Sequence, residues 1–421
     1  MAIVPKAART DTELDTVKKL NDAARWIGSR SLEWASGIRM LLLSLITERH
    51  AFFLGPPGVG KSQVIKDMLR CFDGYELYAQ QMHPEKPVRD LVGYMSIPRY
   101  VKDGVIEYVV HKSLVMKRGI GWLGEIWLGN GSVLNALLGI ANEGTITLGS
   151  QTFETRVVLL GDSNEMPDVV HVAEGDVKRK TLVALADRFL LRDRRPPCVR
   201  SRESQCTMAR MAPDRIRNGQ PPVSISEGEM DKLTATCRDM VQSKTAFPDS
   251  VMKKFFGVIE ALRKEGIPIS DRRWMWAREV LAASALLGGR NTIDESDLKT
   301  TRFWGWLTPA HISTVLEVLQ DSIEMAHPKV MKEETACGKV YQELLDAAKS
   351  DPGLLTDTSK ATLRISRGNI VMAQLSDSIR KLEALSMKHP DEGEEVYASM
   401  DLIKRWNLDV LKRFVGLVVP E

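Results

Sequence analysis

The sequence feature that most constrains the fold is the run Gly55-Pro56-Pro57-Gly58-Val59-Gly60-Lys61-Ser62. It follows the apolar segment 51–54, which predicts a buried strand, and it precedes residues 63–69, whose apolar stripe predicts a helix. A strand, a glycine-rich turn and a helix form the context that a phosphate-binding loop of the G-x-x-x-x-G-K-[ST] type requires. The alternative is a chance turn rich in Gly, Lys and Ser, and the strand before the run and the helix after it argue against that alternative.

Each part of this loop has a physical role. The glycines allow successive backbone N–H groups to surround an anion, and the helix N-terminus adds partial positive charge. We expect Lys61 to reach the β- and γ-phosphates of a nucleoside triphosphate and the Ser62 hydroxyl to bind Mg²⁺. The expected nucleotide contacts are Gly55, Pro56, Pro57, Gly58, Val59, Gly60, Lys61, Ser62 and Gln63.

Composition excludes several other classes of protein. The chain has 421 residues, enough for two or three domains, and with 43% hydrophobic and 27% charged residues it is globular rather than disordered. The net charge of +3, without long runs of one sign, argues against a dedicated nucleic-acid surface. The five cysteines are scattered without a C-x-x-C pair, which argues against a disulfide framework or a zinc site.

No segment predicts a membrane protein. The apolar run 38–46 is too short to span a bilayer, and Arg39 interrupts it. Residues 1–5 do not resemble the start of a signal peptide. We therefore expect a cytoplasmic protein with no membrane span.

Further strands and two hairpins are predicted after the loop. Residues 75–79, 119–126 and 156–161 have the composition of strands. Lys102-Asp103-Gly104 separates two β-prone runs, 94–100 and 105–110, which predicts a first hairpin. A second hairpin is expected between 145–147 and 152–154, with its turn at Gly149-Ser150.

The chain divides into five segments. Helices are expected in residues 1–49, an α/β nucleotide-binding domain in 50–200, a linker in 201–222, an all-helical domain in 223–305 and a C-terminal helical region in 306–421. Ser226 and Glu229 have the spacing of a capping box, so a helix is expected to begin there. A stripe in the last segment is expected to form the core of a helical bundle, with a partner-docking face as the alternative: Met372, Leu375, Ile379, Leu382 and Leu385.

Three polar residues follow the predicted strands and helices of the nucleotide domain. Glu125 ends one strand, and enzymes that hydrolyse nucleotides place a water-activating carboxylate there. Asn164 follows the strand 156–161, where a polar side chain can sense the γ-phosphate. Arg188 ends the helix 182–189, and we expect it to be exposed at the domain edge, where it could enter a neighbouring subunit's site.

The order of the motifs resembles a known family. After the phosphate loop come Glu125-Ile126-Trp127, Ala141-Asn142-Glu143, Ser163-Asn164-Glu165, Ala186-Asp187-Arg188-Phe189 and Ser270-Asp271-Arg272-Arg273-Trp274. Together they resemble the AAA+ ATPases of the MoxR group, and within it the RavA branch, over about residues 20–305.

The resemblance implies a fold and an assembly. The fold would be a P-loop AAA+ parallel-sheet α/β domain followed by an all-helical lid and then the C-terminal helical region. The assembly would be a homo-oligomeric ring, usually a hexamer, that binds ATP and Mg²⁺ between subunits and directs both hairpins toward its pore. Members often act as remodelling chaperones, commonly with a von Willebrand factor A-domain partner.

The resemblance also implies a role for each site residue. Lys61 and Ser62 would hold phosphate and Mg²⁺, and Glu125 would activate water. Asn164 matches sensor 1, Arg188 the arginine finger that acts in trans, and Arg272 sensor 2 of the lid. A surface ion pair is the alternative for either arginine.

The sequence departs from the family at Gly124, where an Mg²⁺-linked Asp usually stands. The enzyme could be slow, with Mg²⁺ held by Ser62, phosphates and water. It could instead bind ATP as an assembly switch with little hydrolysis. A third hypothesis is that Asp162 supplies the missing charge, because the strand that contains it lies beside the Glu125 strand in this fold.

These features are compatible with three functions. A ring ATPase that remodels a partner protein is favoured, and an ATP-gated scaffold is the alternative. A nucleic-acid motor ranks last, because the first hairpin offers only Arg99 and Lys102, and residues 145–155 contain no basic side chain.

Overall fold

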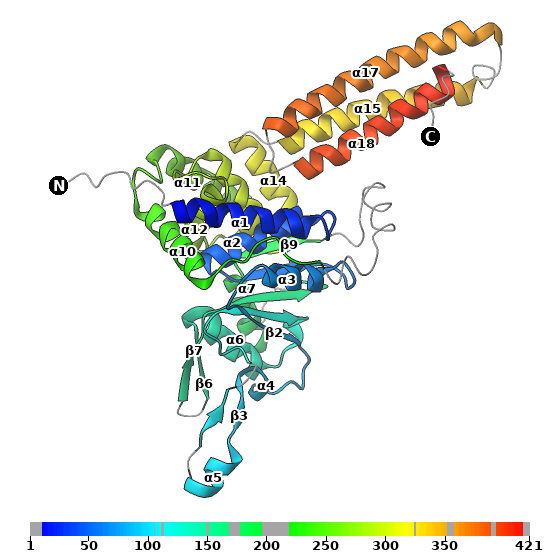
Figure 1. The fold of residues 1–421 in the computed structure, drawn as a ribbon. Helices are drawn as coiled ribbons and strands as arrows, with labels where there is room; N and C mark the ends of the chain where they lie inside the picture. Colours follow the sequence, from blue (N-terminus) through cyan, green and yellow to red (C-terminus); the bar gives the residue numbers. More distant parts are fainter. Residues whose placement is uncertain are drawn as a thin grey trace. The chain divides into compact units, whose positions relative to one another are not determined.

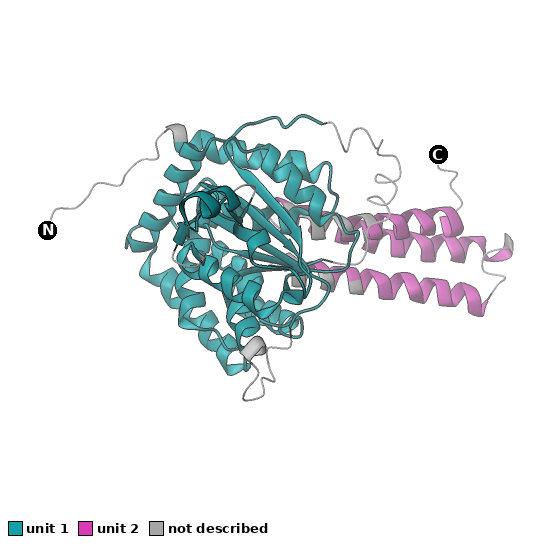
Figure 2. Cartoon of the chain, turned by 90° about the horizontal axis from the view of Figure 1, so that it is seen from below, with its two compact units in different colours: residues 1–323 teal, residues 324–421 magenta. Residues whose placement is uncertain are grey.

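The computed structural model describes residues 11–104, 106–110, 113–148, 151–167, 177–195, 219–323, 326–351, 358–388 and 393–415. The chain forms two compact units, residues 1–323 and residues 324–421 (Figure 2). The first unit contains a parallel sheet and the helices around it, and the second is built from three long helices.

The first unit is organised around a five-stranded sheet with the order β2-β5-β8-β1-β9 (Figure 1). All pairings within it are parallel. Because β1 and β8 are buried along their whole length, their sequences are nearly continuous apolar runs. We call the side where the strands end the carboxyl edge and the opposite side the amino edge. The strands are β1 (Ala51–Leu54), β2 (Glu76–Gln81), β5 (Gly119–Gly124), β8 (Val157–Ser163) and β9 (Leu191–Arg194).

Helices cover both faces of this sheet. Phe52 of β1 belongs to one apolar cluster with residues of α6 and α7. Phe53, the next residue, points to the other face, where its ring centroid lies 5.3 Å from that of Trp34. On this second face α1 packs against α2 and α3. The helices are α1 (Asp11–Gly28), α2 (Ala35–Thr47), α3 (Lys61–Arg70), α6 (Gly131–Glu143) and α7 (Val177–Arg188).

Two insertions leave the sheet domain. The second contains the expected hairpin, in which β6 (Thr145–Leu148) pairs with β7 (Gln151–Glu154), while its turn at 149–150 lies outside the described residues. The first follows α4 (Arg89–Val92) and forms a long projection with α5 (Ile97–Asp103) at its tip (Figure 1). Its two strands, β3 (Tyr94–Met95) and β4 (Tyr108–Val109), are antiparallel and short.

The first predicted hairpin is confirmed in its strands, because β3 and β4 pair, but Lys102-Asp103-Gly104 does not form the turn between them. These residues end α5 instead, and Gly104 adopts φ 66° and donates its N–H to the Tyr100 carbonyl. A glycine in the left-handed region can close a helix as readily as it can close a hairpin. Pro98 lies in the first turn of the helix, where its missing N–H costs nothing.

The helical domain after the sheet packs against α1 and α2. Ser226 and Glu229 form the expected capping box at its first helix, and Asp294 caps a short 3₁₀ helix as part of a second box. Its elements are α10 (Glu227–Gln242), α11 (Asp249–Lys264), α12 (Asp271–Leu287), η2 (Glu295–Thr300) and α13 (Thr301–Trp304), and α14 (His311–Ser322) follows within the same unit.

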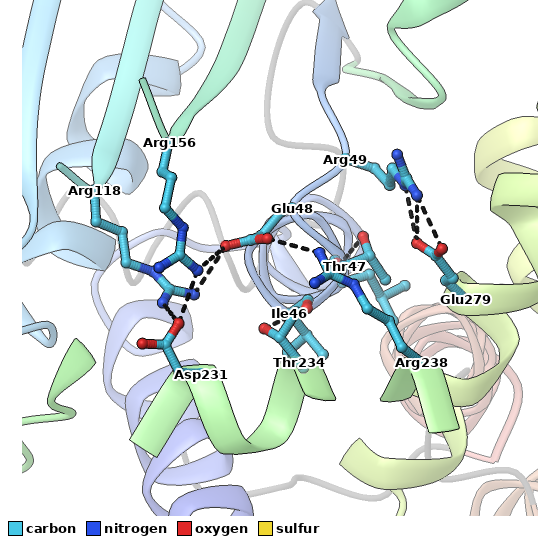
Figure 3. A network of polar contacts seen from close by, with 11 residues as sticks. Ile46, Thr47, Glu48, Arg49, Arg118, Arg156, Asp231, Thr234, Arg238 and Glu279 are labelled. Atoms are coloured by element: carbon cyan, nitrogen blue, oxygen red, sulfur yellow. Dashed lines mark hydrogen bonds and ion pairs between the residues drawn. The ribbon is translucent and has the colours of Figure 1, made fainter. Parts of the chain in front are cut away.

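An ionic network joins this helical domain to the amino edge of the sheet (Figure 3). At its centre Glu48, the residue after α2, lies 2.7 Å from Arg156, 2.8 Å from Arg238 and 3.3 Å from Arg118. Asp231 of α10 lies 2.8 Å from Arg156 and also pairs with Arg118. Because Arg118 and Arg156 precede β5 and β8, the network holds α10 against the amino ends of these strands.

The second unit is a bundle of three helices, each in contact with the other two. Leu375 and Leu382 are fully buried in its core, and the other predicted stripe residues pack against this core. The helices are α15 (Ala326–Ser350), α17 (Ala361–Lys388) and α18 (Gly393–Val410), with the short elements η3 (Thr358–Lys360) and η5 (Leu411–Val415). Among the helices in the described part of the chain, none combines the length and the apolarity that crossing a bilayer requires.

Candidate functional site

The phosphate loop lies at the carboxyl edge, between β1 and α3. Gly58 and Gly60 adopt φ 83° and 88°, which side chains with a Cβ rarely tolerate, and α3 begins at Lys61. The Lys61 ammonium donates a hydrogen bond to the Gly55 carbonyl over 2.8 Å. A Cβ at Gly55 would lie 2.9 Å from the Arg195 carbonyl oxygen, so this first glycine is needed for close packing against β9.

Trp34, in the segment before α2, supports the loop although it lies outside the motif. Its indole N–H donates to the Val59 carbonyl over 3.0 Å. The Arg195 guanidinium lies over the same ring, 4.3 Å from its centroid. A tryptophan that is far from the motif in sequence therefore helps to hold the loop's backbone, and only the folded chain brings the two together.

Two carboxylates stand at the same edge as the loop. Asp162, near the end of β8, is 5% exposed and has an oxygen 3.8 Å from the Lys61 nitrogen. Glu125 follows β5 with φ 49°, and its carboxylate accepts a hydrogen bond of 2.6 Å from the Ser163 hydroxyl. The Glu125 backbone N–H in turn donates to Asp162 over 3.2 Å. The two acids are thus linked to each other and to the phosphate loop.

Asn164, which follows β8, lies beside the start of the loop. It lines a cavity of about 580 Å³ at the carboxyl edge together with Gly55, Pro56 and Arg194. Thr308 and Pro309, which precede α14, close another side of this cavity. The cavity therefore joins the start of the phosphate loop, the end of β8 and the end of β9.

Gly124 stands opposite Gln81 in the register of β5 and β2. A Cβ built at Gly124 would lie 2.3 Å from the Gln81 side-chain oxygen, so the space for a larger residue is occupied by this amide. The sequence shows that the acid is missing at this position, and the structure shows that a neutral amide lies beside it.

The residues present fit Mg²⁺ in the way that nucleotide-binding loops hold it. The described residues contain no group of three or more His, Cys, Asp or Glu side chains arranged to enclose a metal ion. Mg²⁺ keeps several waters and is usually bound through one or two protein oxygens plus substrate phosphates. The Ser62 hydroxyl in the first turn of α3, with Asp162 and Glu125 at the same edge, provides such a partial oxygen set.

Arg188 and Arg272 lie together, but at the amino edge and away from the phosphate loop. Arg188 ends α7 just before β9, whereas the loop follows the carboxyl end of β1, which runs parallel to β9. Four residues of strand separate these levels by about 13 Å. Arg272, in the first turn of α12, lies 3.6 Å from Asp187, the neighbour of Arg188. The structure therefore does not bring Arg272 to the phosphate loop of its own chain.

The expectation that Arg188 is exposed was wrong, because only 9% of it is accessible. Its guanidinium donates to the Ala184 carbonyl over 2.6 Å and to the Asn142 side chain. Burial lowers the pKa of the Arg188 guanidinium, and the positive charge of Arg272 contributes to the shift. Arg188 borders a cavity of about 300 Å³ at the amino edge, whose other lining residues include Arg49, Asn142 and Arg238.

Taken together, a five-stranded parallel sheet, a glycine-rich phosphate loop at its carboxyl edge and a following helical domain define a P-loop nucleotide-binding ATPase of the AAA+ class. Residues 18–233, just over half of the chain, match the family described as the MoxR domain in the MoxR-vWA-beta-propeller ternary systems, and residues 250–319 match an AAA lid domain. The chain therefore belongs to the MoxR-type AAA+ ATPases.

Individual proteins are similar to this chain in sequence or in fold. The uncharacterized protein MJ0812 of Methanocaldococcus jannaschii is 27% identical over 398 residues, covering 93% of this chain and 95% of that protein. MJ0079 of the same organism is 27% identical over 73% of this chain and 75% of its own length. A crystal structure of a predicted ATPase from Cytophaga hutchinsonii has the same fold, with a TM-score of 0.57, 17% identity and coverage of 75% of this chain and 97% of that one.

Proposed function

We propose that this protein is an AAA+ ring ATPase that hydrolyses ATP between subunits to remodel a partner protein. The observation that supports this best is the separation of its polar groups. Lys61, Glu125 and Asn164 lie at the carboxyl edge, and both candidate arginines lie at the amino edge. A nucleotide held by one chain can meet these arginines only if a second chain supplies them.

Each residue at the carboxyl edge has a proposed role. Lys61 would leave the Gly55 carbonyl to bind the β- and γ-phosphates, and the Ser62 hydroxyl would bind Mg²⁺. Mg²⁺, when bound, would neutralise charge that develops on the phosphates. Glu125 would polarise the attacking water, with Ser163 fixing its carboxylate, and Asn164 would contact the γ-phosphate as sensor 1.

The arginines at the amino edge would act in a neighbouring subunit's site. In the isolated chain Arg188 is held by Ala184 and Asn142, so it would have to exchange these bonds for a phosphate oxygen on assembly. Arg272 is more accessible, with 43% of its side chain exposed. A positive charge supplied in trans stabilises the transition state and makes hydrolysis depend on the oligomer, which we expect to be a hexamer.

The proposed partner is a protein rather than a nucleic acid. The projection formed by β3, α5 and β4 exposes seven large apolar side chains, a surface typical of protein contacts. The charge of Arg99 is balanced there by Asp103 and Glu107, at 3.2 and 2.8 Å. The apolar residues are Tyr94, Met95, Ile97, Tyr100, Val101, Ile106 and Val109.

The family description names a von Willebrand factor A domain, and we propose a partner of that kind, as expected for a RavA-like member acting in the cytoplasm.

One observation favours a second function, an ATP-gated scaffold with little hydrolysis. The Gln81 amide fills the space beside Gly124, where related enzymes carry an acid. If no other group replaces that acid, ATP would still bind through Lys61 and the loop backbone. Binding would then drive assembly without efficient turnover.

Steady-state ATP hydrolysis measured against protein concentration tests the proposal. We expect turnover per subunit to rise with assembly and to fall by about 10³-fold or more in Arg188→Ala, the range seen when an arginine finger is removed. Glu125→Gln should abolish turnover while ATP still binds. Lys180→Ala, which removes an exposed cation from the same helix as Arg188, is the matched control and should hydrolyse ATP normally.

Two outcomes would contradict the ring-ATPase proposal. Turnover that is independent of protein concentration and of Arg188 would refute a finger in trans. No turnover above the Glu125→Gln background, with assembly still promoted by ATP, would favour the scaffold.

A further inference from the structure

We propose that Asp162 supplies the carboxylate charge that helps to hold Mg²⁺ beside the phosphate loop, in place of the acid that is absent at position 124. This inference rests on the proposed function, because it concerns the same nucleotide site. It assigns the acid to β8, the strand between β1 and β5, rather than to β5 itself.

The position of Asp162 is the first argument. In the sheet register Asp162 stands opposite Phe53 of β1, and Gly161 stands opposite Leu123 of β5. Asp162 is therefore level with Gly124 and on the same face of the sheet, one strand closer to the phosphate loop. Its carboxylate oxygen lies 3.8 Å from the Lys61 nitrogen, at the point where the phosphates would bind.

The hydrogen bonds of Asp162 are the second argument. One carboxylate oxygen accepts the Trp122 indole N–H over 3.0 Å, and the other accepts the Glu125 backbone N–H over 3.2 Å. Both bonds fix the direction in which the carboxylate points. The bond to Glu125 also ties the metal-side acid to the water-activating residue, so the two are positioned as one unit.

The surroundings of Gly124 are the third argument. Trp122 and Gly124 lie on the same face of β5, since they are two residues apart. The Trp122 indole reaches across to Asp162, and the Gln81 amide covers Gly124 from the other side. Strand β5, which usually provides the acid, here provides the Trp122 indole N–H, and this donor holds Asp162 of the neighbouring strand β8.

A simpler role for Asp162 would be to neutralise Lys61 while no nucleotide is bound. The two roles differ in what they predict. A counter-ion for Lys61 alone would affect nucleotide binding equally with and without Mg²⁺. An acid on the metal side would affect only the Mg²⁺-dependent part of the affinity.

The test uses the full chain with Glu125→Gln, so that bound ATP is not hydrolysed. Binding of a fluorescent ATP analogue is measured in EDTA and across an Mg²⁺ titration. We expect Asp162→Asn to weaken the apparent affinity for Mg²⁺ by about 10–100-fold, the usual range for residues that support a metal site. The affinity for the nucleotide in EDTA should be unchanged or higher, because a negative charge near the phosphates is gone.

Two further variants keep the result interpretable. Asp67→Asn removes a fully buried carboxylate, ion-paired to Arg30, from the helix after the loop, and it should lower stability without changing the Mg²⁺ titration. Trp122→Phe keeps a ring but removes the donor to Asp162, and it should shift the Mg²⁺ titration in the same direction by a smaller factor.

An unchanged Mg²⁺ titration in folded Asp162→Asn or, should that variant not fold, in Trp122→Phe would overturn the inference. An equal change in EDTA and in Mg²⁺ would also overturn it and would assign Asp162 to Lys61 alone. Failure of the Glu125→Gln chain itself to bind ATP would instead refute the proposed function, so the two failures are distinguishable.

Discussion

Protonation of His50 should destabilise the sheet domain below neutral pH. His50 immediately precedes β1 and is 8% exposed. Its Nδ1 accepts the Leu159 backbone N–H over 3.1 Å, and this bond joins β1 to β8. Burial, with a smaller contribution from Arg49, lowers the pKa of His50 from 6.5 to about 4. The neutral ring is therefore built into the fold.

The sign and size of the effect follow from this shift. Because the folded pKa is below the unfolded one, the stabilisation is fully present above pH 6.5 and is lost as the pH falls toward 4. A tenfold change in proton affinity is worth about 1.4 kcal/mol, so the whole shift corresponds to about 3 kcal/mol. Between pH 7 and pH 5 the loss from this one group is about 2 kcal/mol.

The assay is urea unfolding of the full chain at pH 7 and pH 5, followed by tryptophan fluorescence, for the wild type and His50→Asn. The variant keeps a polar side chain at this position but does not titrate between these pH values. Its stability should therefore fall by about 2 kcal/mol less than that of the wild type. Other titrating groups contribute equally to both proteins and cancel in the comparison. An identical pH dependence in the two proteins would refute the reasoning.

Two further predictions concern the phosphate loop and the second unit. Trp34→Phe should keep an aromatic ring but lose the hydrogen bond to the Val59 carbonyl, which is worth about 1 kcal/mol. ATP should therefore bind about fivefold more weakly in a fluorescence titration. Unchanged affinity would show that the loop does not need this support. Leu375→Ala should destabilise the three-helix bundle by about 2–5 kcal/mol in thermal melts, because the side chain is fully buried; a melt identical to the wild type would contradict that packing.

The phosphate loop could be predicted because its information is local. The run from Gly55 to Ser62 combines three positive φ angles with the start of a helix, and this backbone geometry requires particular residues at fixed spacing. The capping box at Ser226 could be predicted for the same reason, since it depends on two residues that are three apart. Strands β1 and β8 could be predicted from their apolar runs because both of their faces are buried.

Other features could not be predicted from local patterns. The run at Asp103-Gly104 is compatible with a hairpin turn and with a helix end, and in the folded projection it forms the end of α5. Arg188 was expected to be exposed because charged helix ends usually are, but Asn142 and the Ala184 carbonyl provide it with buried partners. Nothing in the sequence near the loop indicated that Trp34 would contact Val59.

The amino-acid sequence by itself determined the class of this protein. A phosphate loop, the strand before it and the helix after it each require particular residue types at spacings of a few residues, and such local patterns can be recognised in the sequence. Tertiary structure alone decided how the polar groups are distributed. Parallel strands place the residues that follow β1, β5 and β8 at one edge and those that precede β9 at the other. That geometry brings Asp162 to Lys61 and keeps Arg188 and Arg272 away from it, since strand order and register are set by packing across the whole sheet.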